Sequence, residues 1–349
     1  MFWKGGAGFW ARTSATIMTL VRHVQLCVIY SGAVNQHDLQ VIKQKYPDID
    51  FSWINDGKNK IIKVKLKHLR EIINNQTTAD IYLIDKTENT YALDALPQNV
   101  ITLLDTHDLV HKRNKSAHLA GITDGFNLTS RQERDLFRHY DGIICIQEDD
   151  YNTVSQWAGD YKNLLVPHPI PINPQRLSAT PTRVGIVASA WHANIHGLNY
   201  FIKHIWPKLE NTNLSLNLYG YITEAFQTNT DPSIHLHGFK EKIDDCYKHI
   251  DIAVNPVFYG AGLKIKTIEA MAYGIPQVTT TEGASGLQHL SNKAFLMANN
   301  DEQFIDYINL LLNDEKKRKQ ISDYAVEYVK DNLSEAQCFK PLIDFIRNC

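Results

Sequence analysis

The chain has 349 residues, of which 44% are hydrophobic and 21% are charged, and its formal net charge is -2. This composition excludes disordered and fibrous classes and leaves room for two folded domains of ordinary size. A nearly neutral chain lacks the clustered cationic surface that binds phosphate backbones, so we expect no nucleic-acid partner.

The cysteines and the hydropathy pattern indicate the cellular compartment in which the protein works. Five cysteines are scattered along the chain without a Cys-x-x-Cys spacing, which argues against a disulfide framework and against a zinc site. No window approaches the roughly 18 uninterrupted apolar residues that a membrane span requires. We therefore expect a cytoplasmic protein.

The N-terminal part begins with a glycine loop, which includes Gly5 and Gly6 and leads into a helix. Residues 23–32 then read as a strand, 38–46 as a helix and 51–54 as a short strand. The only dense basic run, residues 58–70, predicts the solvated face of a helix or strand. Peripheral contact with an anionic membrane surface is the alternative.

Two apolar runs that end in aspartate follow, at residues 81–85 and 99–105, as in buried parallel strands. The second run continues into Asp105, His107 and Asp108, which we place at the carboxyl edge of the sheet, with Arg113 a few residues on. Aspartate and histidine at a strand end can also be turn residues only.

The middle of the chain continues the alternation of strands and helices, with a helix at 129–140 and a strand at 142–147. This pattern predicts an open α/β sheet. Five prolines between residues 167 and 181 indicate a stiff, extended linker, so we place a domain boundary at about residue 170.

The pattern restarts with a strand at 183–189 and a helix that begins near Asn194. His192 and His196 stand four residues apart, which is a metal-ligand spacing on a helix. Because no third ligand and no His-Glu-x-x-His pattern accompany them, we expect no metal.

The most informative stretch comes next. A strand at 251–254, a Pro and Gly loop, a helix at 263–273 and a strand at 277–281 form a βαβ unit. The free N–H groups and the dipole at the start of this helix favour an anion, and Lys264 and Lys266 add positive charge. Glu269 lies on the Lys266 face, so a simple surface ion pair on a packed helix is the alternative.

The letters GAGLKIKTIEAMAYGIPQVTT, followed by GASGL, resemble the nucleotide-sugar signature of GT-B glycosyltransferases, in particular family four (glycosyl transferases group 1). The resemblance implies that Glu269 holds the donor ribose and that the loop at Gly262, Leu263 and Lys264 holds the diphosphate, with Lys266 beside it. A second glutamate that is common in the family is replaced by Ala261, so we carry over no donor-sugar contact for that position.

The same resemblance assigns roles outside the βαβ unit. It implies a cleft wall with Asp105 and His107 as catalytic residues, His107 being aimed at the donor sugar or the acceptor. Asn194 is expected to contact the donor. The candidate acceptor or phosphate loop consists of Gly5, Gly6, Asp108 and Arg113.

The fold class implied is α/β, GT-B, with two Rossmann-like open parallel-sheet domains that face a cleft. The N-terminal domain would span residues 1–170, with the helix at 334–349 packing back on it, and the donor domain would span 171–333. In the family a strand precedes the glycine loop. We therefore expect that the first strand of the N-terminal domain is missing, through a late start site or a truncated βα unit.

The implied function is transfer of a sugar from a nucleoside diphosphate sugar to a saccharide or lipid-linked acceptor. Retention of configuration, no metal, no cofactor and a place in surface polysaccharide or glycolipid synthesis belong to this expectation. A GT-A transferase, with the Asp-x-Asp motif at Asp48 and Asp50, is a weaker alternative. A GT-B epimerase and a non-catalytic nucleotide-sugar binder are the other two.

Overall fold

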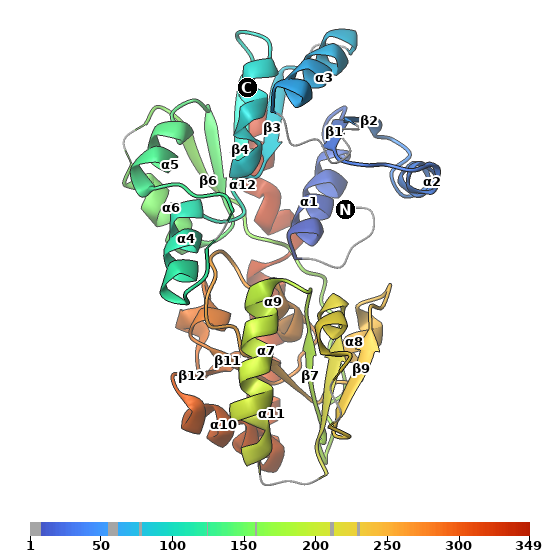
Figure 1. Ribbon diagram of the computed structural model, residues 1–349, viewed down its shortest axis with the longest axis vertical. Coiled ribbons are helices and arrows are strands. Elements are labelled where there is room, and N and C mark those ends of the chain that lie inside the picture. Colours follow the sequence, from blue (N-terminus) through green and yellow to red (C-terminus); the bar gives the residue numbers. More distant parts are fainter. Residues whose placement is uncertain are drawn as a thin grey trace.

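The computed structural model describes residues 8–54, 62–76, 79–123, 125–157, 159–209, 213–228 and 231–349. The expected glycine loop at Gly5 and Gly6 and the first part of the basic run lie outside the described residues. The molecule has two halves, one above the other in Figure 1, and helix α12 from the C-terminus crosses into the N-terminal half.

The strands of the N-terminal half are all parallel but form two separate sheets. One sheet pairs β1 (Cys27–Ser31) with β2 (Asp50–Ile54), and the other has the order β3-β4-β5-β6. These last strands are β3 (Ile81–Asp85), β4 (Ile101–Asp105), β5 (Gly142–Cys145) and β6 (Lys162–Leu165). In the described chain, β1 and β3 each pair on one side only. The pattern predicted a single sheet, but β1 and β3 do not pair among the described residues, so β1 and β2 form a sheet of their own.

Six α-helices accompany these strands in the described residues. They are α1 (Gly8–Leu20), α2 (Gln36–Lys45), α3 (Ile62–Asn75), α4 (Val110–Leu119), α5 (Ser130–Phe137) and α6 (Glu148–Ser155). Sequence signals explain where α2 and α5 begin, because Asn35 and Thr129 each form a capping box with the residue three positions further along the chain. The basic run becomes α3, which buries Leu69 and Ile73 and leaves Lys67 exposed.

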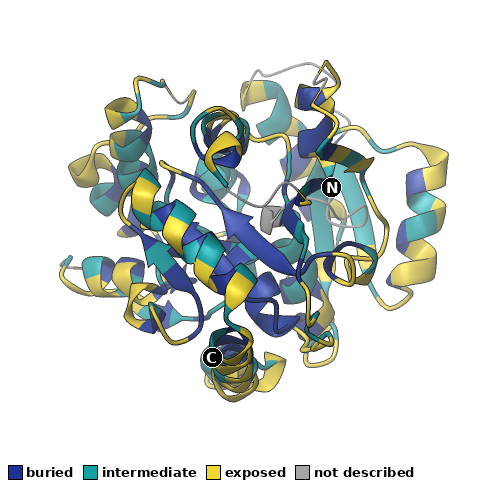
Figure 2. Ribbon diagram, turned by 90° about the horizontal axis from the view of Figure 1, so that it is seen from below, coloured by how far each residue is buried: buried dark blue, intermediate teal, exposed yellow. Residues whose placement is uncertain are grey.

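The C-terminal half is built on one parallel sheet of six strands, in the order β12-β11-β10-β7-β8-β9. The strands are β7 (Arg183–Val187), β8 (Ser215–Tyr219), β9 (Ile234–Gly238), β10 (Ile252–Asn255), β11 (Gln277–Thr280) and β12 (Leu296–Ala298). Its helices are α7 (His192–His204), α8 (Asp244–Tyr247), α9 (Ile265–Ala272), α10 (Asp301–Asn313) and α11 (Glu315–Asn332). Figure 2 shows strands in buried dark blue near the centre and helices with exposed outer faces around them.

One apolar core connects the two halves. It contains Leu103 and Ile144 of the N-terminal sheet, Ile268 of α9, and Phe339 and Leu342 of α12. The segment between β6 and β7, which holds the five prolines, contains no helix or strand.

Helix α12 (Glu335–Arg347) runs through Pro341 without a break. Proline removes one backbone hydrogen bond in a helix interior. Here Cys338 and Phe339 before the proline and Leu342 and Ile343 after it are all buried in the shared core. Their packing holds both parts of the helix in line.

The helices of the described residues are too short or too polar to cross a membrane.

Candidate functional site

The loop before α9 lies against the N-terminal half. Gly262 has a φ of 72°, and a Cβ atom there would lie 2.8 Å from the carbonyl oxygen of His107 and 3.0 Å from Cβ of Asp108. The amide of Gly260 donates to Oγ of Ser116 in α4 at 2.9 Å. Only glycine permits this approach, because a side chain would be both strained and in contact with backbone. The start of α9 therefore faces the end of β4.

Lys264 occupies the N-cap position of α9, so the helix begins two residues later than the predicted Leu263. Its side chain is 7% exposed, and its ammonium nitrogen lies 2.7 Å from Oε1 of Glu282. The same group donates to the carbonyl oxygens of Ala261 and Gly262 at 3.1 Å. Leu263 packs its side chain on the core shared by the halves. The charge of Lys264 is thus held at the helix start by Glu282.

Lys266 and Asn194 are brought together by α9 and α7. Nζ of Lys266 donates to Oδ1 of Asn194 at 2.5 Å, and the Asn194 amide donates to the backbone carbonyl of Ser189 at 3.0 Å. Burial, reinforced by the charge of Lys264, lowers the pKa of Lys266 to about 7. A nearby anion would favour the charged form of Lys266.

Glu269 lies one turn further along α9, and no ion pair joins it to Lys266 in the described chain. Its Oε2 accepts a hydrogen bond from the hydroxyl of Tyr247 in α8 at 3.2 Å. Burial raises the pKa of Glu269 to about 7. Lys266 and Glu269 therefore do not form the surface ion pair that was the alternative interpretation of their spacing.

On the other side of the interface, Asp105 ends β4 and is 1% exposed. Nε of Arg12, a fully buried residue of α1, donates to Oδ2 of Asp105 at 3.0 Å, and Nη1 of Arg12 donates to the carbonyl oxygen of Pro167 at 2.9 Å. Asp105 therefore binds α1 to the sheet. The catalytic role predicted for it stays a prediction, and this burial does not favour it.

His107 follows β4 with a φ of 60°, an uncommon value for a residue other than glycine. Its Nε2 lies 2.6 Å from Oδ1 of Asp85, the last residue of β3, and Oδ2 of Asp85 accepts from the hydroxyl of Thr13 at 3.1 Å. Burial alone would lower the pKa of His107, but the Asp85 carboxylate outweighs it and raises this pKa. The imidazole is thus oriented by Asp85.

Asp108 and Arg113, placed in the candidate phosphate loop, already bind each other. Nη1 of Arg113 donates to Asp108 at 2.7 Å and Nη2 donates to Glu88 at 2.6 Å. Burial raises the pKa of Asp108 in spite of this ion pair. An incoming phosphate would have to compete with two carboxylates for Arg113.

Asp85, Asp105 and His107 place three potential metal-ligand atoms within 4.8 Å of one another, the one such group found in the described residues. The fit to a cation is poor, because the guanidinium of Arg12 already neutralises Asp105. The expectation of a metal-free site stays a prediction. His192 hydrogen bonds to Tyr259 at 2.8 Å, and His196 packs its ring against the same tyrosine.

Several residues of this region were missed by the sequence analysis. Asp85 could have been found, because it ends the strand beside that of Asp105 and parallel strands end at one edge. Arg12, Tyr247 and Glu282 carried no usable signal. Each of them meets its partner only after distant segments have folded together.

Comparisons with known proteins agree with this architecture. The family model "Glycosyl transferases group 1" matches residues 181–314. An "uncharacterized 44.6 kDa protein in cps region" of Klebsiella pneumoniae is 20% identical over 223 residues. The aligned stretch covers 60% of this chain and 57% of that relative, so the match spans little more than half of the relative's length.

Two solved structures show the same fold. A sucrose-phosphate synthase from Thermosynechococcus elongatus superimposes with a TM-score of 0.75 at 16% identity, covering 99% of this chain and 93% of the synthase. HepE from Anabaena, in complex with UDP and glucose, gives a TM-score of 0.73 at 12% identity, covering 99% of this chain and 98% of HepE. The chain thus has the two-domain GT-B fold, and its residues 181–314 match the model of the glycosyl transferases group 1 family.

Proposed function

We propose that the chain is a glycosyltransferase that moves a sugar from a nucleoside diphosphate sugar to a saccharide or lipid-linked saccharide. One observation carries this proposal: the start of α9, with two lysines and Glu269, faces His107 and Asp108 across the contact between the halves. The match to the group 1 family model supports it, as do UDP and glucose in HepE. The relative from a cps region supports a place in surface polysaccharide synthesis.

The diphosphate of the donor would bind at the N-terminus of α9. Free N–H groups and the helix dipole favour an anion there, and Lys264 and Lys266 supply positive charge. A diphosphate would compete with Glu282 for Lys264 and would raise the pKa of Lys266 toward its usual range. The negative charge of the diphosphate grows as the sugar leaves. One well-placed hydrogen-bond donor lowers the barrier of such a reaction by about 2.7 to 4 kcal/mol.

Glu269 is our choice for the donor ribose. One of its oxygens is engaged by Tyr247, and its other oxygen accepts no hydrogen bond from the described residues. That free oxygen suits the hydroxyl groups of a ribose. Asn194, which orients Lys266, would position the phosphate rather than the base.

His107 would face the donor sugar or the acceptor, with its ring fixed by Asp85. Retention of configuration and independence of metal and cofactor are part of the proposal. So is a cytoplasmic reaction at an anionic membrane surface, for which the exposed basic side chains of α3, such as Lys67 and Arg70, are suited.

Incubation with a panel of nucleoside diphosphate sugars and saccharide acceptors tests the reaction. Net transfer to an acceptor supports the proposal. An epimerised donor would instead indicate a GT-B epimerase, and binding without turnover would indicate a non-catalytic nucleotide-sugar binder. A thermal-shift screen of nucleoside diphosphates identifies the base, because a ligand at 100 times its Kd adds about 2.7 kcal/mol of stability.

Glu269→Ala tests the site itself. We expect the affinity for the matching nucleoside diphosphate sugar to fall by at least about tenfold, because the ribose hydroxyls lose their acceptor. Glu302→Ala, which removes an exposed glutamate of α10, is the control and should bind as the parent does. Unchanged affinity in Glu269→Ala would reject the assignment.

A further inference from the structure

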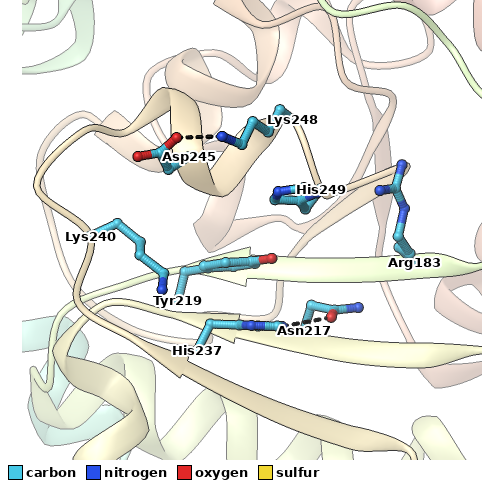
Figure 3. Close-up of a pocket in the computed structure, with 8 residues that line it drawn as sticks. All are labelled: Arg183, Asn217, Tyr219, His237, Lys240, Asp245, Lys248 and His249. Atoms are coloured by element: carbon cyan, nitrogen blue, oxygen red, sulfur yellow. Dashed lines mark hydrogen bonds and ion pairs between the residues drawn. The ribbon is translucent and has the colours of Figure 1, made fainter.

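A pocket of about 570 Å³ lies on the C-terminal half, between α8 and the strands β7, β8 and β9 (Figure 3). None of its residues belongs to the candidate donor site. Arg183 comes from β7, and the segments after β9 and α8 bring further side chains. The lining residues are Arg183, Asn217, Tyr219, His237, Lys240, Asp245, Lys248 and His249.

The pocket is rich in positive charge, with three permanent cations against one carboxylate among its lining residues. Two of the cations are compensated, because Arg183 pairs with Asp251 at 2.6 Å and Lys248 pairs with Asp245 at 2.5 Å. Lys240 has no hydrogen-bonding or ionic partner in the part of the chain that the structure describes. Its charge is free for a ligand.

The sheet side of the pocket is aromatic. The rings of Tyr219 and His237 are stacked, with centroids 4.5 Å apart and planes at 8°. Nε2 of His237 lies 2.9 Å from Oδ1 of Asn217, whose amide nitrogen donates to the carbonyl oxygen of Ser215 at 3.1 Å. Because this amide is oriented by Ser215, Nε2 of His237 is the donor and Nδ1 is the nitrogen left for other contacts.

The surroundings of His237 are positive. Burial, together with His235, Lys240 and His249, lowers the pKa of His237. His249, at the end of α8, has no hydrogen-bonding partner among the described side chains and extends toward the same space (Figure 3). An anion placed here would gain from the charge of Lys240 and would favour protonation of His237, whose Nδ1 then becomes a donor.

We propose that this pocket binds a small phosphate monoester of sugar-phosphate size, at a site separate from the donor site. Lys240 and His249 contact the phosphate, and the exposed His237, backed by the buried ring of Tyr219, lies along the carbon skeleton. The volume favours an organic phosphate over an inorganic ion, because it is in the range of small-molecule sites. The flat ring of His237 suits the apolar face of a sugar ring.

NMR of histidine-labelled protein tests this site with three probes: glucose 1-phosphate, glucose and inorganic phosphate. We expect glucose 1-phosphate to shift the imidazole signals of His237 and His249 saturably, glucose to leave them unchanged and inorganic phosphate to bind more weakly. The absence of a saturable shift would overturn the proposal. Equal affinity for inorganic phosphate would overturn the sugar-phosphate assignment.

Three variants locate the binding. Lys240→Ala should weaken binding of glucose 1-phosphate at least about tenfold, whereas the control Lys203→Ala removes an exposed lysine of α7 and should not. Lys264→Ala alters only the donor site and should leave these shifts intact. Loss of the shifts in Lys264→Ala would place the binding at the donor site instead and would refute the second site without touching the proposed function.

Discussion

Nε2 of His107 and Oδ1 of Asp85 lie 2.6 Å apart, so the second residue after β4 is held by the residue that ends β3. The pair shifts both titrations, because the pKa of His107 is raised from 6.5 and that of Asp85 is lowered from 3.8. The histidine contribution to stability is present below pH 6.5 and is lost as the pH rises through the folded pKa. The aspartate contribution is present above pH 3.8, so both act between these values.

Asp85→Asn should therefore destabilise the protein most between these two pH values. We expect a loss of roughly 1 to 3 kcal/mol at pH 5.5 in denaturant titrations and a smaller loss at pH 9. NMR titration should show a lower pKa for His107, because burial then dominates. Sugar transfer should fall roughly tenfold or more as the ring loses its orientation.

Asp80→Asn is the control for this change, because Asp80 is exposed and precedes β3, at the far end of the strand that Asp85 ends. It should alter stability by less than about 0.5 kcal/mol. A His107 pKa that is the same in Asp85→Asn and in the parent would show that the carboxylate does not set it.

Gly262→Ala should push the loop before α9 away from the N-terminal half. The φ of 72° makes alanine strained by roughly 1 kcal/mol, and the added Cβ would meet the His107 carbonyl at 2.8 Å. Because backbone must move to relieve this contact, we expect nucleoside diphosphate affinity to fall at least about tenfold, measured by calorimetry.

Gly121→Ala provides the matched control, since Gly121 has a φ of 73° and no atom within 4 Å of an added Cβ. It carries the backbone strain without the contact. If both variants lose the same stability and neither loses affinity, the closeness of Gly262 to His107 has no part in binding.

Much of the fold follows from local sequence signals. The strand predicted at residues 81–85 is β3, and the capped helix predicted at 129–140 begins at Ser130. Apolar runs and capping residues act over a few positions, so the sequence displays them. The absence of pairing between β1 and β3 in the described residues could not be predicted in this way, because strand pairing depends on segments far apart in the chain.

The candidate site was predictable in its parts but not in its pairings. Strand ends and the glycine loop place His107 and Gly262 at facing edges, and the structure brings them together. Apart from Asp85, the partners that set the chemistry of the site residues were not foreseeable. Arg12 meets Asp105 across 93 positions, and Tyr247 reaches Glu269 from another element. The roles of these residues in binding and catalysis stay predictions.

Binding of a nucleoside diphosphate should be coupled to proton uptake through Lys266. Its pKa of about 7 leaves it mostly neutral at pH 8, and a diphosphate beside it would restore the proton. Calorimetry with UDP at pH 8, in buffers of different ionisation enthalpy, should give an uptake of about 0.5 to 1 proton.

Lys266→Met should abolish most of this uptake, while Lys203→Met, which removes an exposed lysine, should keep it. An uptake that persists in Lys266→Met would assign the proton to another group, and the pKa of Glu269, also about 7, makes that carboxylate the next one to test.

Arg12→Met should be among the most destabilising single changes in the N-terminal half. It leaves the Asp105 carboxylate buried without its cation, which costs roughly 3 to 5 kcal/mol in denaturant titrations. The double variant Arg12→Met with Asp105→Asn should recover a large part of this loss, because no buried charge remains. If the double variant is no more stable than Arg12→Met, the guanidinium acts through its bond to the Pro167 carbonyl and its packing on Phe339, and not through the ion pair.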